Sequence, residues 1–366
     1  MEEWIKCPLG DILNFRRGHD LPKTSMIPGD IPVAGSNGII GFHNVSTPIS
    51  PCITIGRSGN VGTPYIYDKC WAHNTVLYID DYKGNDPKYL YYLLKTLPLA
   101  SFGGGSAVPT LNRNHIHPLE VVFCKDIELQ KKIAGILSKI DDKIELNRQI
   151  NDNLEQQAQT AFNNIIAQYS ECETVNLSEI AILNPKRAIA KGTFARSIEM
   201  AQLPTSGSFP AGWDMKEYNG GMKFQNGDTL MARITPCLEN GKVAYINFLE
   251  ENEVAFGSTE YIVITSKGAI APEVFYFLTR HNDFVDFAVK NMNGSSGRQR
   301  VSAETIGTYK LPIISPEDMV ILETIAKEAL NKIKYNSLEN IRLSEIRDTL
   351  LPKLMSGELE INEIDC

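Results

Sequence analysis

The fold is decided by two matching stretches, Lys143-Ile144-x-x-Asn147-x-x-x-Asn151-x-x-Leu154 and Lys332-Ile333-x-x-Asn336-x-x-x-Asn340-x-x-Leu343, which lie 189 residues apart. Around both of them, core-type positions recur at alternating steps of four and three residues, over 133–165 and over 322–354. This rhythm is typical of the buried seam of a coiled coil. We therefore predict two helices of about 35–40 residues, each about 50–60 Å long, that pair with each other as a spacer.

The central steps of each seam are asparagines: Asn147 and Asn151 in the first, Asn336 and Asn340 in the second. An amide buried in an apolar seam lowers stability, but it restricts the helices to one register and one orientation. We predict that these four residues set the register of the helix pair.

The segments that precede the two helices repeat as well. Four further pairs match in the same order: 9–14 with 177–184, 53–57 with 229–233, 87–93 with 272–278, and the glycine–serine loops 103–106 with 294–297. Such a repeat indicates two equivalent tasks, or one task on a two-fold symmetric partner. Between turn residues, the patterns predict strands at 49–55, 64–67, 75–79, 119–123, 229–233, 242–246 and 260–265, and short helices at 87–95 and from 272.

These patterns predict an α+β (mixed α/β) fold with an internal pseudo-two-fold repeat. We expect two globular domains, 1–125 and 171–314, separated by one long helix in 126–170 and a second in 315–366, which includes a C-terminal tail. The length of 366 residues suits two domains of about 150 residues each. A hydrophobic content of 43% with 22% charged residues is that of a globular protein and excludes a disordered chain.

The net charge of −8 argues against a generally basic nucleic-acid-binding surface. The excess of acid is uneven, however: 315–366 carries −5, whereas 1–125 carries +1 and 171–314 carries −2. Each globular block can therefore still present a basic face. The seven cysteines are scattered without a C-x-x-C pair, which argues against a zinc ribbon or a disulfide framework. With neither a secretory signal nor an apolar run of about 20 residues, we expect a soluble, cytoplasmic protein without a membrane segment.

The sequence carries no recognisable catalytic motif. The segments 86–89 and 184–187 come nearest to the Asn/Asp-Pro-Pro-aromatic loop of amino-methyltransferases, but both lack the second proline. No glycine-rich cofactor loop, phosphate loop or nucleophile motif is present. His115 and His117 offer two imidazoles without a third metal ligand. We expect a chain with no catalytic residue and no metal.

Residues 143–151 and Leu350-Leu351-Pro352-Lys353-Leu354-Met355-Ser356-Gly357-Glu358 resemble the helical segments of specificity (S) subunits of type I restriction–modification systems. The alternation of globular block and helix resembles the same family over nearly the whole chain. The resemblance implies that each block is a target recognition domain reading one half of a split site in double-stranded DNA. It also implies that the helices pair antiparallel, hold the blocks at a fixed separation and dock two methyltransferase (M) subunits.

The resemblance further implies that restriction (R) subunits join the complex. The partner subunits would then bind S-adenosylmethionine, ATP and Mg, and this chain would bind no cofactor and catalyse nothing itself.

DNA binding needs phosphate contacts for affinity and side chains at base edges for sequence. Arg and Lys suit phosphates and guanine, whereas Asn and Gln suit adenine. The candidate DNA-binding residues of the first block lie on predicted loops: Arg16, Arg17, Arg57, Ser58, Asn60, Asn112, Arg113 and Asn114. Those of the second block are Lys186, Arg187, Arg233, Lys242, Ser295, Arg298, Gln299 and Arg300. We expect the two copies to place Arg57, 112–113 and 298–300 equivalently.

Other interpretations remain open at this point. The pairs 16–17 and 186–187 are also typical of a solvated surface, and 56–62 alone is typical of a simple turn. The whole chain could be a protein-interaction scaffold whose blocks bind something other than DNA. It could also be the specificity subunit of a related bifunctional system, in which one partner fuses nuclease and methyltransferase.

Overall fold

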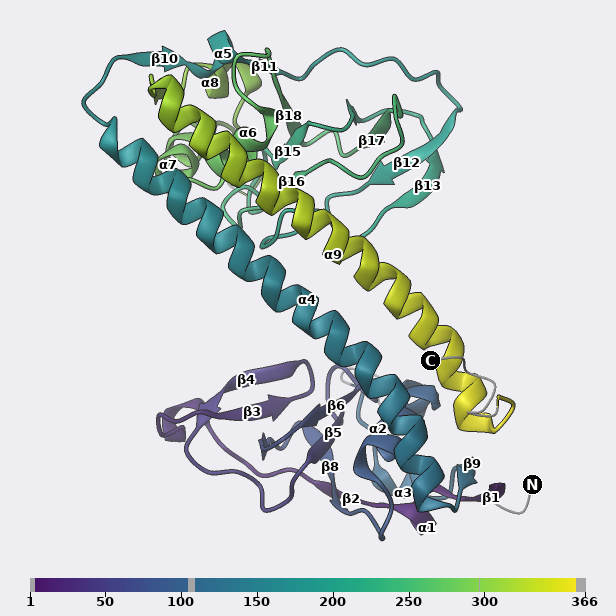
Figure 1. Ribbon diagram of the computed structural model, residues 1–366. Coiled ribbons are helices and arrows are strands. Elements are labelled where there is room, and N and C mark those ends of the chain that lie inside the picture. Colours follow the sequence, from purple (N-terminus) through teal and green to yellow (C-terminus); the bar gives the residue numbers. More distant parts are fainter. Residues whose placement is uncertain (1–3, 105–108, 296, 360–366) are drawn as a thin grey trace. The chain divides into compact units, whose positions relative to one another are not determined.

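The computed structural model describes residues 4–104, 109–295 and 297–359 (Figure 1). Its internal contacts divide the chain into two compact units. Unit 1 comprises the chain up to Lys143 together with the segment from Arg342 onward, and unit 2 comprises Ile144–Ile341. Both units mix helices and strands, so the predicted α+β class is confirmed.

Two helices are far longer than the others: α4 (Ile127–Gln168) and α9 (Pro316–Ser356), with 42 and 41 residues. Within unit 2, the 144–168 part of α4 pairs antiparallel with the 316–341 part of α9. Asn147 Nδ2 donates to Asn340 Oδ1 at 2.9 Å, and Asn336 Nδ2 donates to Asn151 Oδ1 at 2.8 Å. Because the repeat equates Asn147 with Asn336 and Asn151 with Asn340, exchanging the two copies converts one pair into the other. A local pseudo-two-fold axis therefore passes between the two asparagine pairs.

The buried stripe of each helix differs slightly from the predicted seam. Towards the end of α4, Phe162 is buried rather than Ala161, and towards the end of α9, Leu351 is buried rather than Leu350. An α-helix has about 3.6 residues per turn, so a strict 3.5-residue pattern drifts by about 20° in each heptad. The helices follow the seam near the asparagines and pack against globular cores at their ends, where this drift decides which residue is buried.

Unit 1 is built from short elements around one core. Its strands are β1 (Trp4–Pro8), β2 (Asn14–Arg17), β3 (Ile31–Gly35), β4 (Gly38–His43), β5 (Cys52–Gly56), β6 (Pro64–Tyr67), β7 (Trp71–Ala72), β8 (Val76–Asp81) and β9 (Glu120–Cys124). Its short helices are α1 (Leu9–Ile12), α2 (Pro87–Thr96) and α3 (Arg113–Ile116), with 3-10 turns η1 (Lys23–Ser25) and η2 (Leu99–Phe102). The sheets have the orders β2-β8-β5-β6, β4-β3-β7 and β1-β9.

Unit 2 follows the same plan with additions. Its strands are β10 (Thr174–Asn176), β11 (Ala181–Leu183), β12 (Phe194–Ile198), β13 (Asp214–Glu217), β14 (Met222–Phe224), β15 (Thr229–Ala232), β16 (Val243–Tyr245), β17 (Ala255–Gly257), β18 (Tyr261–Ser266) and β19 (Lys310–Pro312). Its short helices are α5 (Leu177–Ile180), α6 (Pro272–Thr279), α7 (Asn282–Lys290) and α8 (Ala303–Gly307). The sheets have the orders β11-β18-β15-β16, β13-β12-β17-β14 and β10-β19.

Two of the three sheets match strand for strand, and the third matches apart from one added strand, so the sequence repeat is also a repeat of structure. The sheet β2-β8-β5-β6 corresponds to β11-β18-β15-β16, and β1-β9 corresponds to β10-β19. In the third sheet, the parallel pair β3–β7 corresponds to the parallel pair β12–β17. Strand β14 and helix α7 account for part of the extra length of the second copy.

Each unit has its own hydrophobic core, and each core takes side chains from both long helices. In unit 1, Ile133 and Leu137 of α4 and Leu354 of α9 are buried with the sheet residues. In unit 2, Phe162 of α4 and Leu322 of α9 are buried in the same way. The ends of the helices are therefore integral parts of the globular folds.

No helix in the described part of the chain is long and apolar enough to cross a membrane. Among the same residues, no group of three or more His, Cys, Asp and Glu side chains is placed to hold a metal ion.

Candidate nucleic-acid interface

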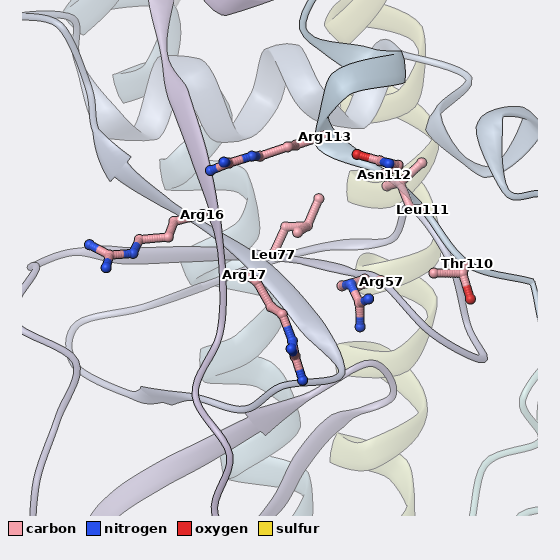
Figure 2. A pocket seen from close by; sticks show the side chains of 8 residues that line it. All are labelled: Arg16, Arg17, Arg57, Leu77, Thr110, Leu111, Asn112 and Arg113. Atoms are coloured by element: carbon pink, nitrogen blue, oxygen red, sulfur yellow. The ribbon is translucent and has the colours of Figure 1, made fainter.

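Four arginines meet at one cavity of about 420 Å³ in unit 1 (Figure 2). Figure 2 shows their side chains arranged around Leu77; the cavity is lined by Arg16, Arg17, Arg57, Leu77, Thr110, Leu111, Asn112 and Arg113. The sheet explains why they meet, because β2 and β5 both pair with β8. The end of β2 and the residue after β5 therefore flank the start of β8.

Backbone bonds hold the loop that carries Arg57. Its amide donates to Thr75 O at 2.8 Å, and its carbonyl accepts from the amide of Leu111 at 2.8 Å. Its Nη1 donates to Asn74 O at 3.3 Å. Glycine is required just before it, because a Cβ on Gly56 would lie 1.7 Å from Asn60 O. Arg57 therefore projects from a closed, hydrogen-bonded turn.

The cavity of unit 1 is strongly cationic. Arg113 Nη1 donates to Phe15 O at 3.0 Å, a contact that leaves the charge of the guanidinium uncompensated. Among the described residues, the cavity arginines make one ion pair, between Arg17 and Asp20 at 3.4 Å. Both side chains of that pair are more than half exposed, so the pair contributes little stability. Four guanidinium groups with one exposed carboxylate form a site for an anion such as a phosphate.

Of the remaining candidates of the first block, Asn112 lines this cavity, and Ser58, Asn60 and Asn114 lie next to lining residues or within three positions of them in the chain. Asn112 Oδ1 accepts from the Asn114 amide at 3.0 Å and caps the N-terminus of α3. The Ser58 amide donates to Thr75 O at 3.1 Å, and Asn60 Oδ1 accepts from Thr63 Oγ1 at 3.4 Å. Ser106, part of the predicted glycine–serine loop, lies outside the described residues.

An equivalent loop arrangement recurs in unit 2. The Arg233 amide donates to Glu260 O at 3.0 Å, and the Arg233 carbonyl accepts from the Val301 amide at 3.0 Å. These are the bonds that Arg57 makes, so Arg233 corresponds to Arg57 and Glu260 to Thr75. An isolated bridge pairs residue 300 with Ile234, as one pairs residue 110 with Ser58. Arg300 is therefore equivalent to Thr110.

This register differs from the expected equivalence of 112–113 with 298–300. The residue equivalent to Asn112 is Ser302, and both cap a short helix: Ser302 Oγ accepts from the Thr305 amide at 3.0 Å. The equivalent of Arg113 is then Ala303. Both loops contain Arg with Asn or Gln side chains. The hydrogen bonds, however, match these residues to positions at least two residues away from those expected from residue type.

Unit 2 balances its arginines with a carboxylate. Glu260 accepts from Arg300 Nε at 3.0 and 2.9 Å and from Arg300 Nη2 at 2.7 Å. Arg233 Nε lies 3.9 Å from the same carboxylate. The hydrogen bonds from Arg300 lower the pKa of Glu260, and the charges of Arg300 and Arg233 act in the same direction. This site is therefore less cationic than the cavity of unit 1.

The side chains of Lys186, Arg187 and Lys242 do not join this cluster through any contact in the described part of the chain. Arg187 donates to Asp228 Oδ1 and to Gln225 Oε1, both at 2.6 Å. Burial raises the pKa of Asp228, whereas the backbone hydrogen bond from Gln225 and the charge of Arg187 act in the opposite direction. Lys242 Nζ donates to Met200 O at 2.6 Å, and Lys186 is exposed.

Three candidates lie on the loop before α8. Ser295 and Arg298 are exposed, and Gln299 is held by its backbone to Thr235. Ser296 lies outside the described residues. A DNA-binding role for all of these side chains stays a prediction.

Sequence reasoning missed Glu260 and Asn74. A search for DNA-binding residues looks for cations and amides, and an acidic residue is passed over. The repeat does contain the necessary clue, because Glu260 immediately precedes β18 just as Thr75 immediately precedes the matching strand β8. Asn74 was overlooked because its role is partly a backbone one: its carbonyl holds Arg57, while its side-chain amide donates to Asp20.

Comparison with known proteins gives the site its context. Residues 1–156 match the family described as the type I restriction modification DNA specificity domain. The specificity subunit of the type I restriction enzyme HindI of Haemophilus influenzae is 24% identical in an alignment of 312 positions that covers 64% of this chain and 68% of that protein. The MjaIX specificity subunit of Methanocaldococcus jannaschii is 24% identical over 313 residues, covering 76% of this chain and 70% of that protein.

The chain is therefore similar to type I specificity subunits, in its first 156 residues by the family description and over as much as 76% of its length by these relatives. The crystal structure of a type I restriction–modification S subunit from M. genitalium has the same fold, with a TM-score of 0.64 and 19% identity over 96% of each chain. The two loop sites are therefore candidates for recognition.

Proposed function

We propose that this chain is a type I specificity subunit that recognises a bipartite sequence in double-stranded DNA, each unit reading one half-site. The observation that carries the proposal is the pair of equivalent loop sites with different side chains. Arg57, Thr75 and Thr110 in unit 1 correspond to Arg233, Glu260 and Arg300 in unit 2. Equivalent positions with different hydrogen-bonding groups suit two half-sites of different sequence.

The chemistry of the two sites fits DNA. Guanidinium groups neutralise phosphates and also donate to guanine, and Asn, Gln, Ser and Thr side chains adapt to base edges. The four arginines of the unit 1 cavity supply a strong phosphate attraction. The loops themselves are fixed by backbone hydrogen bonds, so binding need not first order them.

The two long helices would set the spacing of the half-sites. Each runs without interruption from the residues of one unit into those of the other. The paired asparagines would keep one helix from sliding against the other, because a shift would leave buried amides without partners.

The partners in this proposal are two methyltransferase subunits docked on the helices and restriction subunits that join them. S-adenosylmethionine, ATP and Mg would be bound by those partners, which would methylate adenines and cut DNA with ATP. The system would work in the cytoplasm, where DNA and these cofactors occur.

The experiment is to co-express this chain with the methyltransferase subunit encoded beside it, purify the complex, and map methylated adenines on DNA. We expect a stable complex that methylates one split, asymmetric sequence. A chain that purifies alone and leaves DNA unmethylated would instead favour a protein-interaction scaffold. A partner that fuses nuclease and methyltransferase would indicate the related bifunctional system.

A further inference from the structure

The guanidinium group of Arg300 is held from two sides. Its Nε and Nη2 donate side-on to the Glu260 carboxylate at 2.7–3.0 Å, and its Nη1 donates to the Arg298 carbonyl at 3.0 Å. The backbone beneath it is also fixed, because the amide and carbonyl of Arg300 bond to Asn293, both at 2.9 Å. Arg300 is thus an unusually well-ordered side chain for a residue with 38% of its side chain exposed.

These contacts leave a defined pair of donors. A guanidinium has five N–H groups, and the bonds to Glu260 and Arg298 use one on each of its three nitrogens. Among the described residues, Nη1 and Nη2 therefore each retain one N–H group. Nη1 and Nη2 are bonded to the same carbon, so one N–H group on each nitrogen can meet a pair of acceptors lying side by side.

Two DNA groups offer such paired acceptors: two oxygens of a phosphate, and O6 with N7 of guanine in the major groove. The carboxylate of Glu260 decides between them. A phosphate at the free edge of Arg300 would be close to this ionised carboxylate and would be repelled by it. Guanine presents neutral acceptors and suffers no such repulsion, so the arrangement selects the base.

We propose that Arg300, positioned by Glu260, reads a guanine in the half-site bound by unit 2. The inference rests on the proposed DNA recognition and adds the base and the residue that reads it. Unit 1 has Thr110 and Thr75 at the two equivalent positions, so this reading device belongs to one half-site. Glu260 is a positioning residue that touches the DNA only through Arg300.

The test uses the unmodified chain in its complex with the methyltransferase subunits and the target sequence mapped as above. Each guanine of the second half-site is replaced in turn by 7-deazaguanine, which lacks the N7 acceptor, and the dissociation constant is measured. One replacement should weaken binding about tenfold, because a bidentate pair to guanine discriminates by roughly 5- to 150-fold. This measurement needs no variant, so it does not depend on how a substitution affects folding.

Variants then assign the contact to Arg300. In the Arg300→Ala variant, the same 7-deazaguanine should weaken DNA binding by less than twofold, while methylation at the first half-site is retained. Lys290→Ala is the matched control: it removes a positive charge from an exposed side chain of α7 and leaves Arg300 and its contacts in place, so the tenfold penalty should persist. Glu260→Gln should reduce the penalty and make binding more sensitive to salt, as Arg300 turns to phosphate.

Three results would overturn the inference: a second half-site without guanine, no effect of any 7-deazaguanine there, or an Arg300→Ala defect equal for all sequences with a salt slope reduced by about one. Each leaves a sequence-specific complex intact, so none of them contradicts the proposed function. Failure of the complex to recognise any sequence would instead refute the proposed function.

Discussion

Replacing Arg57 by alanine should lower the salt dependence of DNA binding more than replacing Arg233. Arg57 lines the cavity with three other arginines, and its guanidinium contacts Asn74 O, not a carboxylate. Arg233 shares its surroundings with the ionised Glu260, at 3.9 Å. A phosphate contact made by Arg57 is therefore worth more than one made by Arg233.

The magnitude follows from counterion release. Each phosphate contact contributes about 0.9 to the slope of log Kobs against log salt. Between 50 and 200 mM salt, losing one contact therefore reduces the fall in affinity by about 3.5-fold. If all four cavity arginines engage phosphates, they account for a slope of about −3.6, and Arg57 should carry a quarter of it.

The assay is fluorescence anisotropy of the complex with a labelled target duplex at five salt concentrations. The Arg57→Ala slope should be less steep by about 0.9, and the Arg233→Ala slope should change by less than half as much. Lys69→Ala, which removes an exposed positive charge on the turn before β7, is the control and should leave the slope unchanged. Equal changes for Arg57→Ala and Arg233→Ala would refute the assignment of phosphate binding to the unit 1 cavity.

Three further predictions concern stability and spacing. Arg280→Ala should lower the free energy of unfolding by about 3–5 kcal/mol in urea titrations, because the Arg280 side chain, only 15% exposed, pairs with Glu155 at 3.3 Å and donates to three carbonyls. The double change Glu155→Ala/Arg280→Ala should lower the free energy of unfolding by less than the sum of the two single changes. Burial, together with the charge of Arg113, lowers the pKa of His117, and the neutral Nε2 accepts the backbone N–H of Phe15. The neutral imidazole therefore stabilises the fold fully above about pH 6.5, and this stabilisation is lost as the pH falls below that value. His117→Gln should therefore narrow the difference in thermal midpoint between pH 5.5 and 7.5. An unchanged difference would show that His117 does not cause the pH dependence of stability. Inserting one heptad into both α4 and α9 should lengthen the preferred gap between half-sites by about three base pairs, since seven residues rise about 10 Å; methylation mapping that returns the original gap would contradict a spacer role.

Local patterns predicted the central framework because its elements are marked by local physics. Pro87 in the first turn predicts the start of α2, and the structure adds the Asp86 side chain as its cap, 2.8 Å from the Tyr89 amide. The heptad seam predicts α4 and α9, and its asparagines lie opposite each other. Such features need only a few neighbouring residues to be recognised.

The second sheet of each unit was not predicted: the turn at Ser36-Asn37-Gly38 marks the β3–β4 hairpin locally, but nothing local marks the parallel pairs that complete the sheet. Strand β7 has two residues, and β12 pairs in parallel with β17, almost 60 residues later in the chain. The site was only partly predictable for a similar reason. The cationic residues were found by type, but the equivalence of Arg300 with Thr110 depends on hydrogen-bond register, which insertions in the second copy conceal.

The two copies show how one framework can carry different recognition chemistry. The bonds that close each loop run between backbone atoms: Arg57 with Thr75 and Leu111 in unit 1, and their counterparts around Arg233 in unit 2. Because these bonds do not depend on side chains, a threonine in one copy can be a glutamate or an arginine in the other while the loop keeps its shape. Exchanging Thr75 and Thr110 for the glutamate and arginine of unit 2 would therefore test recognition without dismantling the loop. If the glutamate and arginine alone are sufficient to recognise guanine, the first half-site should acquire a preference for guanine, and the second half-site should keep its own preference.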